Sequence, residues 1–262
     1  MSGHPELYAV RYGTASTSRS RFFFDFASAG EPDAEMVTDY FFYVVRSAGE
    51  TILVDCGFDA EVARRRGRTP LVDPLVGLGD LGIDADDVSR IVITHFHYDH
   101  VGNLGLFPEA SLVAQASEAG FWASDVAKRP RFAGVTEPDE LAALAAAARS
   151  SRLELITGSA EVAPGVLMEL VGGHTPGQSI LRVATASGEV ILASDALHCY
   201  EEMVLDRPFA VFTDLAGSYQ AFDRLRELES FGATIIAGHD PLVTDRYRES
   251  GSVGEPVILR LG

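Results

Sequence analysis

Short apolar segments that end at Gly, Asp or Asn recur along this chain and predict β-strands. Buried strands typically show about four to eight aliphatic or β-branched residues bounded by turn residues. TILVD before Gly57 and RIVIT before His95 have this form. The same pattern places strands at residues 51–55, 90–94, 111–114, 166–171, 180–184, 190–193 and 234–237.

Apolar residues at helical spacing predict two clear helices among these strands. Residues 139–149 are rich in alanine and follow Pro138, and proline is favoured at the first position of a helix. Residues 218–231 form the second helix, for which Ser218 is the predicted N-cap. Its repeating apolar positions are Phe222, Leu225, Leu228 and Phe231.

Two segments fit neither pattern. Residues 59–86, rich in Arg, Pro and Gly, are interpreted as a loop with a short helix, serving as a connector rather than as a lid or a subunit contact. The aromatic run of Phe22, Phe23 and Phe24, followed by Phe26, is interpreted as a strand or hairpin packed on the core. A role as a substrate wall is the alternative.

Charge and composition exclude several classes of protein. With 21 basic and 38 acidic residues the net charge is −17, which disfavours nucleic acid as a partner. No run of about 18 apolar residues predicts a membrane span, and residues 1–21 lack the apolar centre of a signal peptide. The only two cysteines, Cys56 and Cys199, are too few for a disulfide framework. We therefore expect a cytoplasmic protein, and we expect Cys199 to be a buried free thiol.

Histidine supplies the candidate chemistry. Six of the seven histidines lie near strand ends or turns, where a rigid scaffold positions functional groups. Imidazole nitrogen and carboxylate oxygen are typical zinc ligands. Three imidazoles and a carboxylate within six residues would be costly to bury without a cation. The candidate ligands are His95, His97, Asp99, His100, His174, Asp195 and His239.

Seven donors exceed what one tetrahedral zinc requires and suit two divalent ions. A carboxylate can bridge such a pair, and a water shared by two metals has its pKa lowered to about 7, which gives hydroxide at neutral pH. Zinc is the expected metal, and manganese, iron or cobalt suit the same donors.

These motifs resemble the metallo-β-lactamase superfamily over nearly the whole chain. The resemblance implies an α/β fold, an αββα sandwich of two mixed sheets flanked by helices, formed as a single domain over residues 1–262. It also implies that His95, His97 and His174 hold one metal, that Asp99, His100 and His239 hold the other, and that Asp195 bridges them. The motifs are HFHYDH at 95–100, GHTPG at 173–177, SD at 194–195 and GHD at 238–240.

Within this superfamily the chain is most similar to the N-acyl homoserine lactonase group, which implies lactone opening and a quorum-quenching role. Those lactonases carry a tyrosine three residues after the bridging aspartate, where this chain has His198. Imidazole can still donate a hydrogen bond or protonate a leaving alkoxide, although its reach and pKa differ.

The resulting hypothesis is a dinuclear hydrolase that opens an acyl homoserine lactone or another small lactone by attack of a metal-bridging hydroxide. Asp99 is the predicted proton carrier, and His198 is the predicted second catalytic group. Thioester or aryl and alkyl ester hydrolysis is the enzymatic alternative, and metal-dependent binding of a small molecule is the non-enzymatic one. A monomer or a homodimer is expected. The predicted substrate contacts are Tyr98, Phe107, Trp122, His198 and Phe209.

Overall fold

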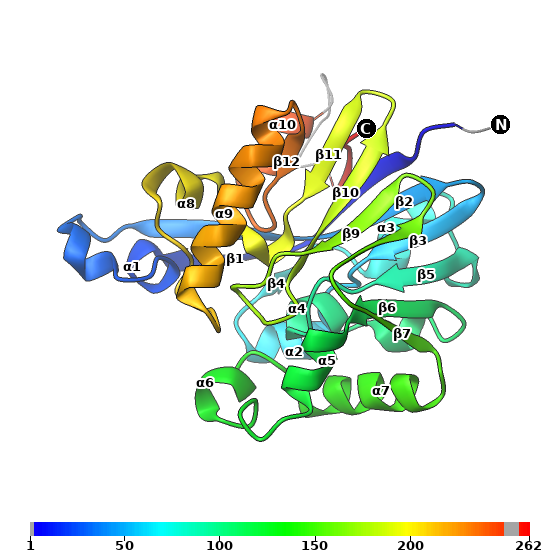
Figure 1. Cartoon of the computed structure of the whole chain (residues 1–262), viewed down its shortest axis with the longest axis horizontal. Coiled ribbons are helices and arrows are strands. Elements are labelled where there is room, and N and C mark those ends of the chain that lie inside the picture. Colours follow the sequence, from blue (N-terminus) through cyan, green and yellow to red (C-terminus); the bar gives the residue numbers. More distant parts are fainter. Residues whose placement is uncertain (1–2, 249–256) are drawn as a thin grey trace.

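Two mixed β-sheets packed face to face, with helices on both outer sides, form the framework of this computed structural model, which describes residues 3–248 and 257–262 (Figure 1). The first sheet has the strand order β13-β1-β2-β3-β5-β6-β7, with β4 paired to β1. Its strands are β1 (Glu6–Ser18), β2 (Glu35–Ser47), β3 (Glu50–Val54), β4 (Thr69–Pro70), β5 (Val88–Val92), β6 (Ser111–Gln115), β7 (Leu153–Ile156) and β13 (Ile258–Arg260).

The second sheet has the order β12-β11-β10-β9-β8 and is antiparallel except for the parallel pair β11 and β12. Its strands are β8 (Ser159–Ala163), β9 (Val166–Leu170), β10 (Ser179–Thr185), β11 (Gly188–Leu192) and β12 (Thr234–Ile236). The predicted αββα sandwich is therefore confirmed. All seven predicted strands are present, with ends that differ by at most two residues.

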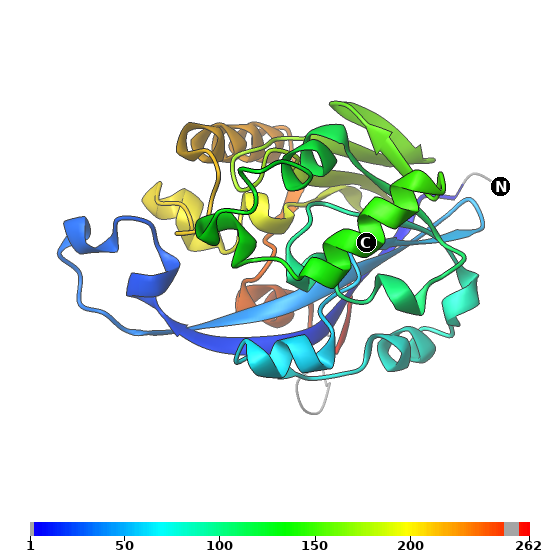
Figure 2. The ribbon, with the colours of Figure 1, turned by 90° about the horizontal axis from the view of Figure 1, so that it is seen from below.

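Helices cover the outer face of each sheet (Figure 2). The helices on the first sheet pack against a core that contains Tyr12, Phe42 and Ile91, whereas α9 packs against Ile180 and Ile191 of the second. The helices are α1 (Arg19–Phe22), α2 (Ala60–Arg65), α3 (Pro74–Asp80), α4 (Tyr98–Val101), α5 (Ala116–Trp122), α6 (Pro130–Ala133), α7 (Pro138–Arg149), α8 (Tyr200–Leu205), α9 (Leu215–Ser230) and α10 (Pro241–Tyr247).

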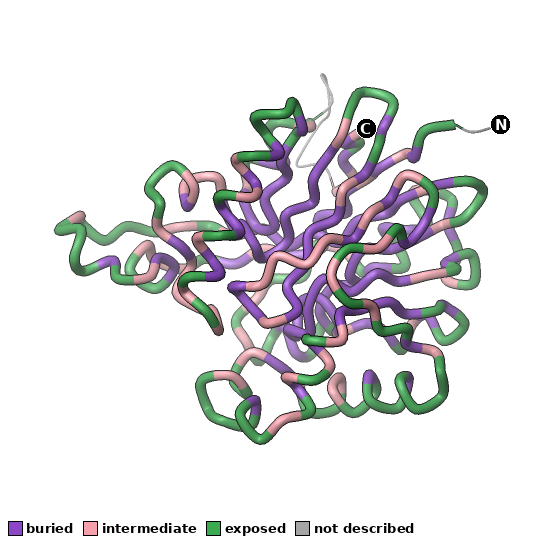
Figure 3. Tube along the Cα trace, in the orientation of Figure 1, coloured by how far each residue is buried: buried purple, intermediate pink, exposed green. Residues whose placement is uncertain are grey.

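A third core lies between the two sheets (Figure 3). Alternation along β2 explains how one strand serves two layers, because successive side chains point to opposite faces. Phe42 and Val44 contribute to the core under the helices, and Phe41 and Tyr43 contribute to the core between the sheets. Since both faces are buried, β2 reads as a continuous apolar run rather than as an alternating one.

The N-cap prediction for the long helix is wrong. Helix α9 begins at Leu215 after Asp214, and Ser218 lies within its first turn, where its Oγ donates to the Asp214 carbonyl oxygen. At the other end Phe231 is 80% exposed and adds nothing to the core. The other three predicted apolar positions, Phe222, Leu225 and Leu228, are confirmed and form the apolar face of α9 together with Ala221.

The two segments without a clear pattern form structure of their own. Strands β1 and β2 pair into a long hairpin that projects to the left in Figures 1 and 2 and carries α1 and a 3₁₀ turn, Phe26–Ala29, near its tip. The aromatic run therefore lies in the hairpin, as helix and turn rather than as strand, and Phe22, Phe23 and Phe26 are buried in a core cluster as predicted. Residues 59–86 contain α2, β4 and α3, which is more order than a connecting loop requires.

Both cysteines are buried free thiols, as expected for Cys199. In the part of the chain that the structure describes, no helix has both the length and the apolar character needed to cross a membrane.

Candidate metal centre

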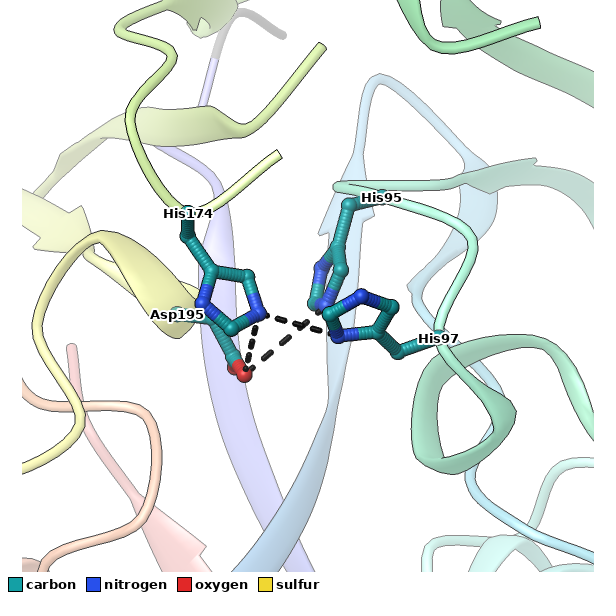
Figure 4. Close-up of side chains that lie close together, drawn as sticks. All are labelled: His95, His97, His174 and Asp195. Carbon is teal, nitrogen blue, oxygen red and sulfur yellow. Dashed lines mark hydrogen bonds and ion pairs between the residues drawn. The ribbon is translucent and has the colours of Figure 1, made fainter. Parts of the chain in front are cut away.

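Four loops at one end of the sandwich bring the candidate ligands together. The loop after β5 leads into α4 and carries the residues of the HFHYDH motif, and the loop between β9 and β10 carries His174. The chain after β11 turns through a 3₁₀ segment, Ser194–Ala196, which holds Asp195, and the chain after β12 carries His239. Figure 4 shows His95, His97, His174 and Asp195 pointing toward one another from these separate segments.

One donor group consists of His95, His97, His174 and Asp195, whose ligand atoms all lie within 4.8 Å of one another. Nε2 of His174 lies 2.9 Å from Nδ1 of His97 and 3.2 Å from Oδ2 of Asp195. Nε2 of His95 lies 3.7 Å from the same carboxylate oxygen. Three imidazoles and a carboxylate thus converge on a single point, as a tetrahedral metal site requires.

The second group consists of Asp99, His100 and His239, again with ligand atoms within 4.8 Å of one another. Oδ2 of Asp99 lies 3.8 Å from Nε2 of His100 and 3.9 Å from Nε2 of His239. Asp195 connects the groups, because its other oxygen, Oδ1, lies 3.1 Å from Nε2 of His100 and 3.0 Å from Nε2 of His239. This is the position that a bridging carboxylate would occupy.

The buried donor set fits divalent cations. Nε2 of His95 and Nε2 of His100 are buried without a hydrogen-bond partner among the described residues, which is costly unless another group satisfies them. Burial, followed by repulsion from neighbouring imidazoles, lowers the pKa of His95 and His97 well below the usual value. Burial likewise lowers the pKa of His174 to about 3. Neutral imidazoles with open nitrogens are the form that binds a metal.

The second ring nitrogens of His100, His174 and His239 are each oriented by a neighbour. Nδ1 of His100 lies 2.7 Å from Oδ2 of Asp55, and Nδ1 of His239 lies 2.9 Å from the carbonyl oxygen of Asp39. Nδ1 of His174 lies 2.9 Å from the carbonyl oxygen of Val211. Such outer contacts select the ring tautomer and leave Nε2 free to act as a ligand.

Asp55 is a functional residue that the sequence reasoning did not identify. It follows β3 in the left-handed conformation (φ 60°), and its carboxylate accepts hydrogen bonds from both the backbone nitrogen and Oγ1 of Thr94, each at 2.8 Å. The same carboxylate contacts His100, so one buried acid orders the start of the histidine loop and one ligand in it. The sequence feature that could have identified Asp55 is its position in a Val-Asp-Cys-Gly turn directly after a buried strand.

Glu118 links two of the ligand loops. Its carboxylate accepts hydrogen bonds from the backbone nitrogen of Phe96, between two ligands, and from the backbone nitrogen of Gly177, beyond His174. Nε1 of Trp122 donates to it as well, at 2.6 Å. Burial raises the pKa of Glu118. Nothing in the local sequence distinguishes this glutamate from a solvated helix residue.

Close backbone contact explains the glycine before His239. A Cβ atom at Gly238 would lie 2.5 Å from the carbonyl oxygen of Ser194, next to Asp195. Two ligand-bearing turns therefore touch through their backbones, and only glycine allows this approach.

A cavity of about 270 Å³ opens over the two donor groups. Its wall comes from the β1–β2 hairpin with Phe22, the segment before β4, residues 134–135 and residues 209–211. Of the predicted substrate contacts, Tyr98, His198 and Phe209 line this cavity. Phe22 also lines it, so the aromatic run serves as wall and core together.

The other two predicted contacts lie elsewhere, which corrects that part of the expectation. Phe107 is buried in the core under the first sheet, where the packing of its ring leaves none of it facing the cavity. Trp122 borders a separate apolar cavity of about 220 Å³ between α5 and α7. Its ring packs edge-on against His97, with centroids 5.8 Å apart, so it supports a ligand rather than a substrate.

His198 lies at the boundary between donor groups and wall. Its Nε2 is 3.0 Å from Oδ2 of Asp195, and its ring centroid is 4.1 Å from that of Phe209. Burial opposes a positive charge here, but Asp195 and Glu202 outweigh burial and raise the pKa of His198 to about 10. Glu202 also accepts a hydrogen bond from the backbone nitrogen of Cys199, which fixes the turn that carries His198.

Comparison with known proteins places this site in a family. The model of the Metallo-beta-lactamase superfamily matches residues 38–239, which include every candidate ligand. The chain belongs to this superfamily. The resemblance deduced from the motifs is thereby confirmed, and the two buried donor groups are consistent with a dinuclear metal site.

Two individual members of the superfamily are similar to this chain at a low level of sequence identity. An N-acyl homoserine lactonase of Bacillus thuringiensis is 29% identical over 164 residues, or 61% of this chain and 59% of the relative, so the match spans less than two thirds of that protein. N-acyl homoserine lactonase AiiB of Agrobacterium fabrum is 28% identical over 217 residues, or 76% of this chain and 78% of the relative.

The fold is shared with solved structures as well. One is an N-acyl homoserine lactone hydrolase with the product N-hexanoyl-L-homoserine bound at the catalytic metal centre, with a TM-score of 0.77 and 22% identity. The superposition covers 95% of this chain and 99% of that structure. The similarity supports the shared sandwich architecture.

Proposed function

We propose that this protein hydrolyses the ring ester of a small lactone. The observation that carries the proposal is the position of Asp195, whose two carboxylate oxygens contact both donor groups at the floor of an aromatic cavity. Two similar proteins carry the name N-acyl homoserine lactonase, which supports a lactone as the class of substrate.

The residues proposed to hold the cations are the two donor groups, with Asp195 shared between them. Divalent cations, when bound, supply hydroxide at neutral pH and polarise the carbonyl of an ester. The fixed second-nitrogen contacts of His100, His174 and His239 keep their Nε2 atoms aimed at these positions.

Asp99 is the residue proposed to carry a proton. It lines the cavity, and its backbone carbonyl accepts a 2.6 Å hydrogen bond from Oη of Tyr12, which fixes the turn that presents its carboxylate. In ring opening, a water oxygen bonds to the carbonyl carbon, the ring C–O bond breaks, and the alkoxide takes up the proton that the water loses. A carboxylate that faces both positions can transfer that proton.

His198 is proposed to assist at the oxygen atoms that gain negative charge. Its ring lies between Asp195 and the aromatic pair of Phe22 and Phe209, so its position is set from both sides. An imidazole N–H can donate a hydrogen bond to the carbonyl oxygen or to the leaving oxygen as charge develops there. We propose that this residue replaces the tyrosine of the related lactonases.

A hydrolysis screen with a pH indicator tests the proposal directly. Lactones, open-chain esters, thioesters and β-lactams are compared at equal concentration, with metal-stripped protein and Asp99→Asn protein as controls. We expect lactones to give the fastest turnover and both controls to lose it. Faster turnover of a thioester or a β-lactam would reject the lactone in favour of that class, and binding without turnover of any substrate would indicate a binding protein.

A further inference from the structure

The cavity wall contains a cationic group for which neither the metal centre nor the proposed ester chemistry has a use. Arg68 lies directly before β4 and lines the cavity together with Asp99. Its Nε donates a 2.9 Å hydrogen bond to Oη of Tyr98, and its Nη1 donates to the carbonyl oxygen of Arg66 at 3.2 Å. The guanidinium group is half-buried and held in one orientation.

Arg68 keeps binding capacity that the protein itself does not use. Among residues 3–248 and 257–262, no carboxylate lies within salt-bridge distance of Arg68, and its Nη2 makes no hydrogen bond. A half-buried charge without a counter-ion is unfavourable, and this chain has 38 acidic residues that could have supplied one. Asp99 acts on Arg68 through space only and is itself part of a donor group.

The neighbouring arginine shows the contrast. Nη2 of Arg66 lies 2.7 Å from Oε1 of Glu137, and its other contacts are the carbonyl oxygens of Gly134 and Thr136. Its guanidinium also stacks over the ring of Tyr98, at 4.2 Å from the centroid. Arg66 is therefore occupied in holding the wall together, whereas Arg68 presents an open edge to the cavity.

We propose that Arg68 forms an anion-binding subsite and that the substrate is a lactone bearing a carboxylate group. This inference rests on the lactone hydrolysis proposed above and specifies its substrate. A guanidinium fixed by two of its nitrogens offers the remaining one to a carboxylate with little loss of side-chain entropy. Tyr98 and Tyr40 flank Arg68, while Phe22 and Phe209 pack around His198, so the cavity separates a polar end from an apolar one.

A matched pair of substrates tests the subsite. The pair is a lactone whose side chain ends in a carboxylate and the same lactone ending in a primary amide. For the unmodified protein we expect kcat/KM to favour the carboxylate about tenfold or more, as for a hydrogen bond to a charged group. Arg68→Met should reduce that ratio to about one, and Arg68→Lys should retain part of it because the charge remains without the planar fork.

Arg64→Met is the control variant. Arg64 lies exposed on α2, and its side chain makes no hydrogen bond or ion pair among the described residues, so its removal changes net charge equally without touching the cavity. We expect it to keep the preference for the carboxylate. An unchanged preference in Arg68→Met, or an unmodified protein that prefers the amide, would overturn the proposal. Either result would indicate that the substrate carries a neutral hydrogen-bond acceptor rather than a carboxylate.

Calorimetric binding of a carboxylated five-membered lactam, which resists hydrolysis, separates this inference from the proposed function. Tighter binding to the unmodified protein than to Arg68→Met, by about tenfold, supports the subsite even if no lactone is opened. Equal affinity for the two proteins refutes the subsite even if lactones are opened rapidly.

Discussion

The floor of the cavity comes from four short turns at strand ends, whereas its wall comes from segments that no single motif connects. Buried acids order this floor: Asp55 contacts the ligand His100, and Glu118 links two of the ligand-bearing loops. The wall draws on the β1–β2 hairpin, the segment before β4 and residues 209–211. The floor is thus built for fixed geometry and the wall for selection among substrates, so substitutions in the two regions should have different effects.

Loss of a floor ligand should have the largest effect. We expect His100→Ala or Asp195→Asn to lower kcat by roughly a thousandfold or more, because several kcal/mol of stabilisation at the reacting oxygen are lost. Steady-state turnover of the best lactone, together with metal content per chain, checks this. Near-normal turnover in either variant would contradict a two-metal floor.

An outer contact of the floor should matter less than a ligand and more than a wall residue. Asp55→Asn keeps the shape and tolerates the left-handed backbone at this position, but it removes the negative charge beside His100. We expect metal affinity to fall about ten- to a hundredfold, measured by competition with a chelator. Asp59→Asn, which alters a helix cap on α2, should leave metal affinity unchanged.

The buried glutamate that links two floor loops should affect stability as well as activity. Glu118→Ala leaves three buried N–H groups without their acceptor, and each unsatisfied group costs about 1–3 kcal/mol. We expect the free energy of unfolding in urea to fall by roughly 3 kcal/mol or more. Glu109→Ala, at an exposed position, should change it by no more than about 0.5 kcal/mol, and an equally small change for Glu118 would refute the linking role.

A wall substitution should change substrate choice while the floor stays intact. Phe22 packs against Phe209 and lies near His198, with ring centroids 4.9 Å and 6.1 Å apart. We expect Phe22→Ala to raise KM for lactones with apolar side chains about tenfold, from about 1–3 kcal/mol of lost burial, with metal content unchanged. A fall in metal content would show that wall and floor are not separate.

The smallest expected effect is a change of folding stability with pH, which involves Glu140 on α7. Burial, and next the nearby charges of Glu137 and Asp99, raise the pKa of Glu140 on α7 to about 8. Because the folded state favours the protonated acid, this contribution to stability is complete below the ordinary pKa and is lost as pH rises through about 8. Glu140→Gln should therefore gain in melting temperature relative to the unmodified protein between pH 6 and 9, and a constant difference would contradict the raised pKa.

The floor and the wall of the cavity also differ in how much of each could be predicted from the sequence. The candidate donors of the floor could be picked out because they lie in local motifs at strand ends, and their division into two groups followed from the resemblance to the superfamily. Asp55 escaped notice since its role depends on a contact 45 residues away, and Glu118 depends on one 59 residues away. The overall fold followed from the resemblance to the superfamily. The short strands were predictable as apolar runs bounded by turn residues, whereas β1 and β2, at 13 residues each, do not match that pattern.

The wall could not be predicted, since it depends on which distant segments the folded chain brings together. Tyr98 and Phe209 were chosen correctly as cavity residues, but Phe107 and Trp122 pack elsewhere, because an aromatic residue in sequence gives no sign of which cavity it faces. Arg68 carried no signal among the other arginines of residues 59–86. Its significance follows only from the absence of an acidic partner among the described residues.

The number of divalent metal ions per chain, measured by elemental analysis of purified and metal-reconstituted protein, tests the central claim most directly. The account predicts two ions per chain in the unmodified protein and a loss of metal in Asp195→Asn, because both donor groups contact that carboxylate. One ion per chain in the unmodified protein, or two ions retained in Asp195→Asn, would contradict a floor built around a shared aspartate.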